Sequence, residues 1–215
     1  MLLHVDAAMA AGHVPIDFDG LGLDLLSVSA HKLGGPPGVG ALLVRRGLRL
    51  RPLLLGGDQE RARRAGLEPV AAIAGFGAAA AALTGGALEV EATAQRELTD
   101  RVLAGLAALE GVHPFGDVRH RLPQLVCLGV DGVEPQAVLL GLDRAGVAAH
   151  SGSACSSESL EPSPVLEAMG VDAHHSLRLS VGWSTTVADV DAALAALPPI
   201  LSGLRSLGGS QAARK

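Results

Sequence analysis

The stretch Ser27-Val28-Ser29-Ala30-His31-Lys32, continued by Leu33-Gly34-Gly35-Pro36-Pro37-Gly38-Val39-Gly40, decides how the rest of the chain is interpreted. It places two hydroxyl groups, an imidazole and an amine at the end of a mostly apolar run, and a loop with four glycines and two prolines follows. A strand that delivers small polar groups and one amine to a tight turn is a common way to seat a phosphorylated cofactor. Lys32 is the only lysine besides Lys215, so any chemistry that needs a lysine amine points to it. The alternative is that Lys32 is a solvated turn residue.

Length and composition indicate a folded protein with one sizeable core or two modest domains. Hydrophobic residues make up 48% and charged residues 18% of the 215 residues, which argues against a disordered chain. The net charge of -5, the aromatic content of 2% and the absence of tyrosine give no reason to expect a nucleic-acid partner. Two cysteines are too few for a disulfide framework, so a reducing, cytoplasmic location is expected.

Neither a secretory signal nor a membrane span is expected. The N-terminus has no basic region followed by an apolar one. Residues 70–88 carry no charge and are long enough to cross a membrane, but nine of them are alanine, so the segment is only weakly hydrophobic. Its large side chains Ile73, Phe76 and Leu83 recur near helical spacing. This pattern predicts a buried helix of a soluble protein.

The alternation of apolar runs and helical patterns predicts an α/β protein. The expected strands cover residues 2–6, 24–29, 39–44, 125–130, 147–149 and 177–181. The expected helices cover a segment that starts near residue 69 and residues 89–109, 135–145 and 186–197. The strands at 24–29 and 39–44 are largely apolar, which predicts burial on both faces. Leu98, Val102, Leu106 and Leu109 define one apolar face of the helix at 89–109, and Pro198-Pro199 is expected to interrupt the last helix.

A domain boundary is predicted near residue 88, which gives domains at residues 1–88 and 89–207 and a flexible tail at 208–215. Residues 45–66 form a loop-like stretch between elements and contain seven arginines. One interpretation of this stretch is a nucleic-acid patch. Asp58 and Glu60 lie among the arginines and aromatic residues are absent, so a solvated or subunit-facing loop is the favoured alternative.

Cys155 lies in a run of small residues, Ser151-Gly152-Ser153-Ala154-Cys155-Ser156-Ser157, which predicts an accessible cysteine. Such a position suits a nucleophile or a group that must travel, and the alternative is an incidental surface cysteine. The histidines near it lack paired-ligand spacing, so no metal site is expected. Cys127, between Val126 and Leu128, is predicted to be a core residue.

Arg178 lies inside the apolar strand segment Leu177-Arg178-Leu179. An arginine in this environment needs a partner, and a carboxylate is the natural bidentate one. That carboxylate belongs either to an internal Asp or Glu or to a substrate.

Taken in order, these features resemble the cysteine desulfurases, which are pyridoxal-phosphate enzymes of the class V aminotransferase group within fold type I. His4-Val5-Asp6-Ala7-Ala8 is similar to the strand that carries the family's acid, and Ser29-Ala30-His31-Lys32 is similar to its cofactor-lysine motif. Residues 56–66 resemble its Gly-Gly-x-Gln-Glu-Arg loop. Residues 151–157, followed by Leu160-Glu161-Pro162-Ser163, resemble the catalytic loop of its long-loop subgroup.

The resemblance implies an α/β fold that is the C-terminal part of a fold type I pyridoxal-phosphate-dependent transferase. Residues 1–88 would be a partial cofactor-binding large domain and residues 89–207 a small domain with the cysteine loop. By resemblance, Lys32 would bind pyridoxal 5'-phosphate covalently and move protons. Asp6 would pair with the pyridine nitrogen, and Ser29 and His31 would bind the phosphate.

The resemblance also implies a sulfur-transfer reaction. Arg178 would hold the carboxylate of L-cysteine, and the Cys155 thiolate would attack the substrate sulfur, leaving L-alanine and an enzyme-bound persulfide. His150, just before the loop, would be placed to help deprotonate a thiol. The implied partners are a sulfur-acceptor or iron–sulfur scaffold protein and a second copy of the chain in a homodimer.

Three departures from the family pattern leave other functions open. Met9 stands in place of a glutamine and Leu67 in place of a threonine that reaches the neighbouring subunit's cofactor. The chain also begins at what would be the middle of the family's large domain. The alternatives are a truncated, non-catalytic remnant that binds a sulfur-acceptor partner and another class V lyase or aminotransferase.

Overall fold

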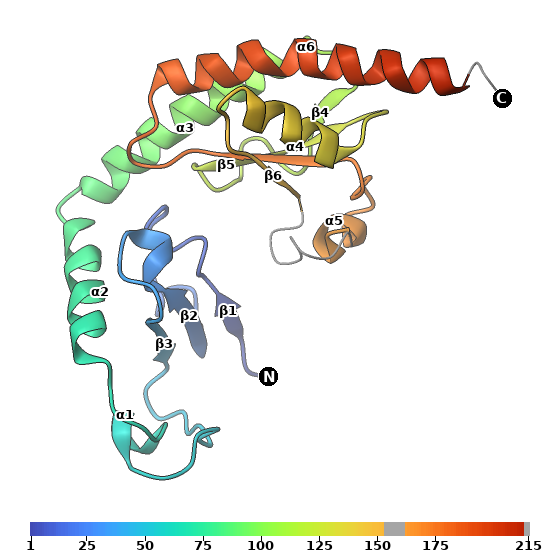
Figure 1. The fold of residues 1–215 in the computed structure, drawn as a ribbon. Helices are drawn as coiled ribbons and strands as arrows, with labels where there is room; N and C mark the ends of the chain where they lie inside the picture. Colours follow the sequence, from blue (N-terminus) through green and yellow to red (C-terminus); the bar gives the residue numbers. More distant parts are fainter. Residues whose placement is uncertain (153–161, 213–215) are drawn as a thin grey trace. The chain divides into compact units, whose positions relative to one another are not determined.

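The computed structural model describes residues 1–152 and 162–212 (Figure 1). It divides the chain into two compact units, Met1–Ala92 and Thr93–Lys215. The predicted boundary is residue 88, and the division falls inside α3 (Ala87–Leu106), the helix that starts in the first unit.

The first unit is built on a three-stranded sheet in the order β1-β2-β3. Its strands are β1 (His4–Asp6), β2 (Leu25–Ser29) and β3 (Gly40–Val44). β1 runs parallel to β2, and β3 is antiparallel to β2. The short 3-10 helix η1 (Ala30–Leu33) follows β2, and the helices α1 (Gln59–Ala62) and α2 (Val70–Ala82) follow β3. All three predicted strands are therefore present, in a sheet of mixed direction.

The first unit has only a small buried core, formed mainly by Ala7, Leu23 and Leu26. The predicted burial of both faces is wrong for β3, because Leu42 and Leu43 expose 48% and 38% of their surface. The predicted burial of the alanine-rich helix is also wrong, since α2 contains no buried residue. The physical reason is the size of the unit, because a three-stranded sheet with one long helix cannot enclose both faces of the sheet and the helix together.

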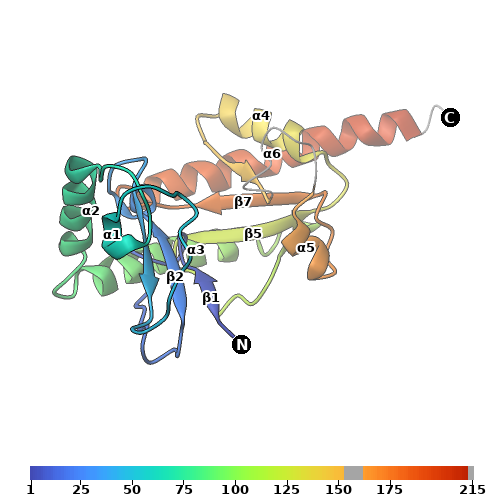
Figure 2. The ribbon, with the colours of Figure 1, turned by 90° about the horizontal axis from the view of Figure 1, so that it is seen from below.

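The second unit contains a four-stranded antiparallel sheet in the order β4-β5-β7-β6. The strands are β4 (Val112–Pro114), β5 (Leu125–Val130), β6 (His150–Ser151) and β7 (Ser176–Ser180). The helices are α4 (Pro135–Arg144), α5 (Pro164–Ala168) and α6 (Val187–Ala212), together with most of α3. Figure 2 shows β5 and β7 side by side. The strand predicted at 147–149 is instead the two-residue β6, because the residues that pair with β7 are His150 and Ser151.

One face of this sheet packs against α3, α4 and α6 to form the larger core of the chain. The predicted apolar face of α3 is confirmed, since Leu98, Val102 and Leu106 are buried and Leu109 packs beside them. The strands supply alternate residues to the same core. These strand residues are Val126, Leu128, Val130, Leu177 and Leu179.

The expected interruption of the last helix at Pro198-Pro199 is wrong, because α6 continues through both prolines to Ala212. The tail predicted from residue 208 is thus helical as far as residue 212, and residues 213–215 lie outside the described part of the chain. A proline inside a helix costs about 3 kcal/mol. Leu197 and Leu201 flank the prolines and are almost fully buried, and burying such side chains contributes roughly 1.5–3 kcal/mol each. Core packing therefore offsets the lost helix stability.

Residues Val187–Leu207 of α6 are long and apolar enough to cross a membrane. The helices α2 and α3 are so only if they are counted together as one bent span. Such a signal is weak for a helix that contributes to a core. Val190, Leu197 and Leu201 of α6 lie in the core of the second unit, and 22% of the apolar window is buried.

Asp24 ties the three strands of the first sheet together. Its Oδ2 accepts a hydrogen bond from the Leu3 N–H at 2.8 Å, and its Oδ1 accepts one from Arg45 Nε at 2.6 Å. The Leu3 hydrogen bond, followed by the one from Arg45, lowers the pKa of the Asp24 carboxyl below its usual value. These contacts join the residues before β1 and after β3 to the start of β2.

The lowered pKa of Asp24 predicts how acid affects the first unit. Because the pKa of Asp24 is lower in the folded chain than its ordinary value of 3.8, the ionised carboxylate stabilises the fold at pH values above 3.8. This stabilisation is lost as the pH falls through the pKa of the folded state. Asp24→Asn should therefore lower the melting temperature at pH 7, and its difference from the native chain should shrink between pH 5 and 3. Thermal unfolding followed by circular dichroism across this range measures the difference. Asp19→Asn, at an exposed position, is the matched control, and an Asp24→Asn difference that stays constant with pH would contradict the assignment.

Candidate functional site

The residues predicted to bind a cofactor come together at one edge of the first sheet. Because β1 and β2 are parallel, their carboxyl ends lie at the same edge, which is where open α/β sheets bind ligands. Asp6 is the last residue of β1 and Ser29 is the last residue of β2. His31 and Lys32 follow at once in η1. The structure thus places an acid, a hydroxyl, an imidazole and an amine within one short region.

The backbone around Lys32 is held by hydrogen bonds on both sides of the turn. Ala30 is fully buried, its N–H donates to the Val39 carbonyl at 3.1 Å, and its carbonyl accepts from the Gly35 N–H at 2.9 Å. Gly34 ends the turn with φ of 87°, a left-handed conformation that favours glycine. The Lys32 side chain is exposed and makes no hydrogen bond or ion pair with residues 1–152 or 162–212. A fixed turn therefore presents a free amine.

Three local hydrogen bonds orient the polar groups beside this turn. Asp6 Oδ1 accepts from Ser27 Oγ at 3.2 Å and from the Ala8 N–H at 3.0 Å. Ser29 Oγ and His31 Nδ1 lie 2.9 Å apart and form a hydrogen bond. The carboxylate at the end of β1 and the hydroxyl–imidazole pair at the end of β2 thus have defined positions before any ligand is present.

Arg178 lies in the second unit on the sheet face opposite the helices. Its neighbours Leu177 and Leu179 point into the core, so Arg178 points to the other face. There it pairs in register with Cys127 on β5 and His150 on β6. Within residues 1–152 and 162–212, no hydrogen bond or ion pair engages its guanidinium, although the side chain is half-buried. In that part of the chain, no Asp or Glu forms an ion pair with Arg178.

Cys127 is placed differently from the prediction. It was expected in the core, but it lies beside Arg178 on the opposite face and is only half-buried. The alternation along β5 explains the difference, because Val126 and Leu128 take the inward positions. That alternation was visible in the sequence and would have identified the correct face. Burial raises the pKa of the Cys127 thiol, which opposes thiolate formation.

His150 is held in one tautomer by its neighbour. Its Nδ1 lies 2.8 Å from the Ser151 carbonyl oxygen, and because a carbonyl only accepts, Nδ1 carries the proton. Nε2 is then the basic nitrogen of the neutral ring. The role of His150 as a base stays a prediction.

Cys155 lies outside the described residues, but both flanks of its loop are anchored in the second unit. The Gly152 N–H donates to Ser176 Oγ at 3.1 Å. A side chain at position 152 would lie 2.4 Å from the same oxygen, so only glycine fits there. On the other flank, Ser163 is the N-cap of α5, where its hydroxyl accepts from the Leu166 N–H.

The two residues that depart from the family pattern are both exposed. Met9 follows the Asp6 strand and exposes 40% of its surface, and Leu67 exposes 88%. Leu67 comes after the Gly-Gly-x-Gln-Glu-Arg loop, in which Gln59 Oε1 accepts from the Gly66 N–H at 3.2 Å. The loop is therefore closed on itself by the glutamine of its motif.

Residues 1–193 match the model of the aminotransferase class V family, and the chain belongs to that family. Its curated relatives include cysteine desulfurases. The chain is 46% identical over 210 residues to the cysteine desulfurase of Gluconacetobacter diazotrophicus, covering 96% of this chain and 52% of that protein. It is 43% identical over 212 residues to the cysteine desulfurase NifS of Azotobacter vinelandii, with 96% and 52% covered.

The fold is similar to that of solved structures of a NifS-like protein and of a cysteine desulfurase. A NifS-like protein from Rickettsia africae superposes with a TM-score of 0.84 at 32% identity, covering 94% of this chain and 54% of that one. The cysteine desulfurase CsdA of Escherichia coli gives a TM-score of 0.80 at 27% identity, with 95% and 52% covered. The chain thus spans about half the length of the proteins it matches.

Proposed function

We propose that this chain carries the cofactor-lysine and persulfide-loop portions of a cysteine desulfurase. The observation that carries the proposal is the placement of Asp6 and the Lys32 turn at the carboxyl ends of two adjacent parallel strands. Arg178 of the second unit, which has no hydrogen-bond or ion-pair partner among residues 1–152 and 162–212, supports an amino-acid substrate. The cysteine desulfurases that are 43–46% identical over 96% of this chain support L-cysteine as that substrate.

Class V aminotransferases depend in general on pyridoxal 5'-phosphate, and the residues at the edge of the first sheet fit this group. When bound, pyridoxal phosphate supplies an electron sink at the α-carbon of an amino acid. The Asp6 carboxylate would hold the proton of the pyridine nitrogen. Ser29 and His31 would donate hydrogen bonds to the phosphate. The Lys32 amine would hold the cofactor covalently and move a proton at the substrate α-carbon.

In the sulfur transfer, the side chains of this chain act on L-cysteine. Arg178 would hold the substrate carboxylate with two parallel hydrogen bonds. The Cys155 thiolate would attack the substrate sulfur, so that an S–S bond forms while the substrate C–S bond breaks. The electron pair of the broken bond stays with the carbon, which then takes a proton. The products are L-alanine and a persulfide on Cys155.

The enzyme-bound persulfide implies a second partner that takes the sulfur. We propose a sulfur-acceptor or iron–sulfur scaffold protein for this role, and a homodimer in the cytoplasm as the working form. The exposed apolar side chains of β3 support a further protein contact on the first unit. No nucleic-acid or membrane partner is proposed.

The experiment that tests the proposal follows both products of the reaction. The chain is incubated with pyridoxal phosphate and L-cysteine, alanine is quantified by amino-acid analysis, and the persulfide is located by peptide mass spectrometry. Equal amounts of alanine and of sulfur on Cys155 in a single turnover are expected. Cofactor capture on Lys32 without either product would refute the desulfurase assignment.

Removing the guanidinium of Arg178 should weaken substrate binding. Arg178→Ala is expected to raise the KM for L-cysteine about 100-fold, because two charge-assisted hydrogen bonds are lost. Arg178→Lys should recover part of this loss, since it restores the charge without the bidentate geometry. Steady-state kinetics measure the effect, with Arg144→Ala at the end of α4 as the control. An unchanged KM in Arg178→Ala would exclude Arg178 from carboxylate binding.

A further inference from the structure

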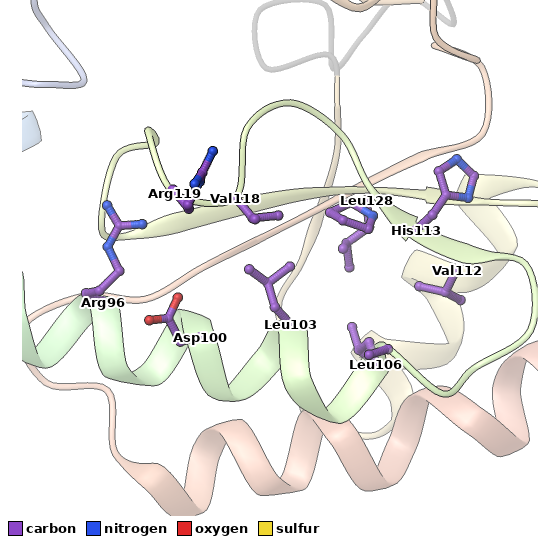
Figure 3. A pocket seen from close by; sticks show the side chains of 11 residues that line it. Arg96, Asp100, Leu103, Leu106, Val112, His113, Val118, Arg119 and Leu128 are labelled. Atoms are coloured by element: carbon purple, nitrogen blue, oxygen red, sulfur yellow. The ribbon is translucent and has the colours of Figure 1, made fainter.

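A cavity of about 550 Å³ lies in the second unit between α3 and the strands β4 and β5 (Figure 3). Its floor is apolar and includes Leu106 and Leu128, which are almost fully buried. Leu103 and Val112 continue the apolar wall, and Val118 forms an exposed lip. The volume falls within the range of roughly 300–1,000 Å³ that is typical of small-molecule sites.

Within the second unit, this cavity lies apart from Arg178, the residue proposed to hold the substrate carboxylate. Leu128 faces the helices, so the cavity lies on the helix-covered side of the sheet. Arg178 lies on the other side. The sulfur-transfer reaction therefore gives this cavity no role, and an inference about it does not depend on the proposed function.

One end of the cavity carries positively charged groups, as Figure 3 shows for Arg96 and Arg119. Asp100 also lies there, but its Oδ1 is 2.5 Å from an Arg121 guanidinium nitrogen, so its charge is already neutralised. Arg96 donates to the Arg121 carbonyl at 2.6 Å, which fixes its guanidinium. The Arg119 guanidinium has no hydrogen bond or ion pair with any residue in the described ranges 1–152 and 162–212.

Two guanidinium groups, those of Arg96 and Arg119, and one carboxylate, that of Asp100, line this end of the cavity, and Asp100 is paired with Arg121. The carboxylate of Asp117, next to Arg119, is paired with His120. The pKa of Arg121 is lowered, first by burial and then by the positive charge of Arg96. An additional anion would relieve this repulsion. A carboxylate is the anion that a planar guanidinium group binds with two parallel hydrogen bonds.

We propose that this cavity binds an apolar monocarboxylate. The hydrocarbon body lies against Leu103, Leu106 and Leu128, and the carboxylate binds at the end that carries Arg96 and Arg119. Asp100 pairs with Arg121, so the guanidinium groups of Arg96 and Arg119 are left to bind one carboxylate. The apolar wall selects a ligand with a hydrocarbon body over a small inorganic anion.

The test is a titration of the 215-residue chain with octanoate, followed by ¹H–¹⁵N NMR. Octanoate should shift the amide signals of Leu103, Val112 and Val118. Acetate, which lacks the body, and 1-octanol, which lacks the charge, should each bind at least about tenfold more weakly. Absence of shifts, shifts confined to other residues, or equal binding of 1-octanol would overturn the proposal.

Two variants test the two halves of the cavity. Arg119→Gln should weaken octanoate binding about tenfold, because one charge-assisted hydrogen-bonding group is lost. Arg144→Gln, an exposed arginine outside the cavity, should leave it unchanged. Val118→Trp, at the exposed lip, should fill the opening and abolish binding without disturbing the core. Native affinity in both Arg119→Gln and Val118→Trp would overturn the proposal.

Discussion

Lys32→Ala is expected to abolish covalent capture of pyridoxal phosphate by the chain and to lower conversion of L-cysteine by at least about 1,000-fold. The reason is that Lys32 is the only lysine besides Lys215. Lys32 is the only lysine in the turn after β2, and this turn is fixed by the buried Ala30 and by Gly34. A loss of this size corresponds to about 4 kcal/mol of transition-state stabilisation.

The measurement combines borohydride reduction with peptide mass spectrometry, so that it reports on binding as well as on activity. In the native chain, the cofactor mass should appear on the peptide that contains Lys32. Lys215→Ala is the matched control, because it removes the chain's only other lysine. Cofactor mass on Lys215, or equal labelling in Lys32→Ala, would show that the lysine is wrongly assigned.

Cys155→Ser should keep cofactor capture on Lys32 but stop sulfur transfer, with a loss of at least about 1,000-fold in alanine formation. A serine hydroxyl is far less acidic than a thiol, so it supplies no anionic nucleophile at neutral pH. Single-turnover assays of alanine, together with detection of protein-bound sulfur, measure this loss.

Cys127→Ala provides the control for the second cysteine. Burial raises the pKa of the Cys127 thiol, so Cys127 is a poor nucleophile despite its position beside Arg178. Persulfide and alanine should therefore form in Cys127→Ala at close to the native rate. A large loss in this variant and a small loss in Cys155→Ser would reverse the roles of the two cysteines.

The sequence predicts much of the secondary structure because local patterns determine it. The apolar run before Ser29 ends in a turn rich in glycine and proline, which indicates a strand end, and β2 ends at Ser29. The helical spacing of Leu98, Val102 and Leu106 identified the buried face of α3 in the same way. In both cases the pattern lies within a few residues of the feature that it predicts.

The wrong predictions concern burial and packing, which depend on residues distant in sequence. Leu42 in β3 has an apolar sequence context, but no local signal reports how much of the sheet is covered. The continuation of α6 through Pro198 depends on Leu197 and Leu201 packing against distant strands and helices. For the candidate site, the sequence supplied the predicted residue types and their order. The position of Arg178 beside Cys127 and His150 became visible only with the pairing of β5, β6 and β7.

The two prolines of α6 have a consequence for how this helix opens. Proline has no N–H, so Pro198 and Pro199 donate nothing to the carbonyls of Leu194 and Ala195. The ladder of backbone hydrogen bonds is therefore broken at two consecutive residues, and continuity across the break comes from the side chains of Leu197 and Leu201. Beyond the prolines, the helix is held to the core by the buried Leu201 and by Arg205, whose guanidinium donates to the carbonyls of Glu110, Gly111 and Asp131. Opening of the helix after Pro199 therefore requires breaking these contacts with distant residues, because the local backbone hydrogen bonds are already missing at the two prolines.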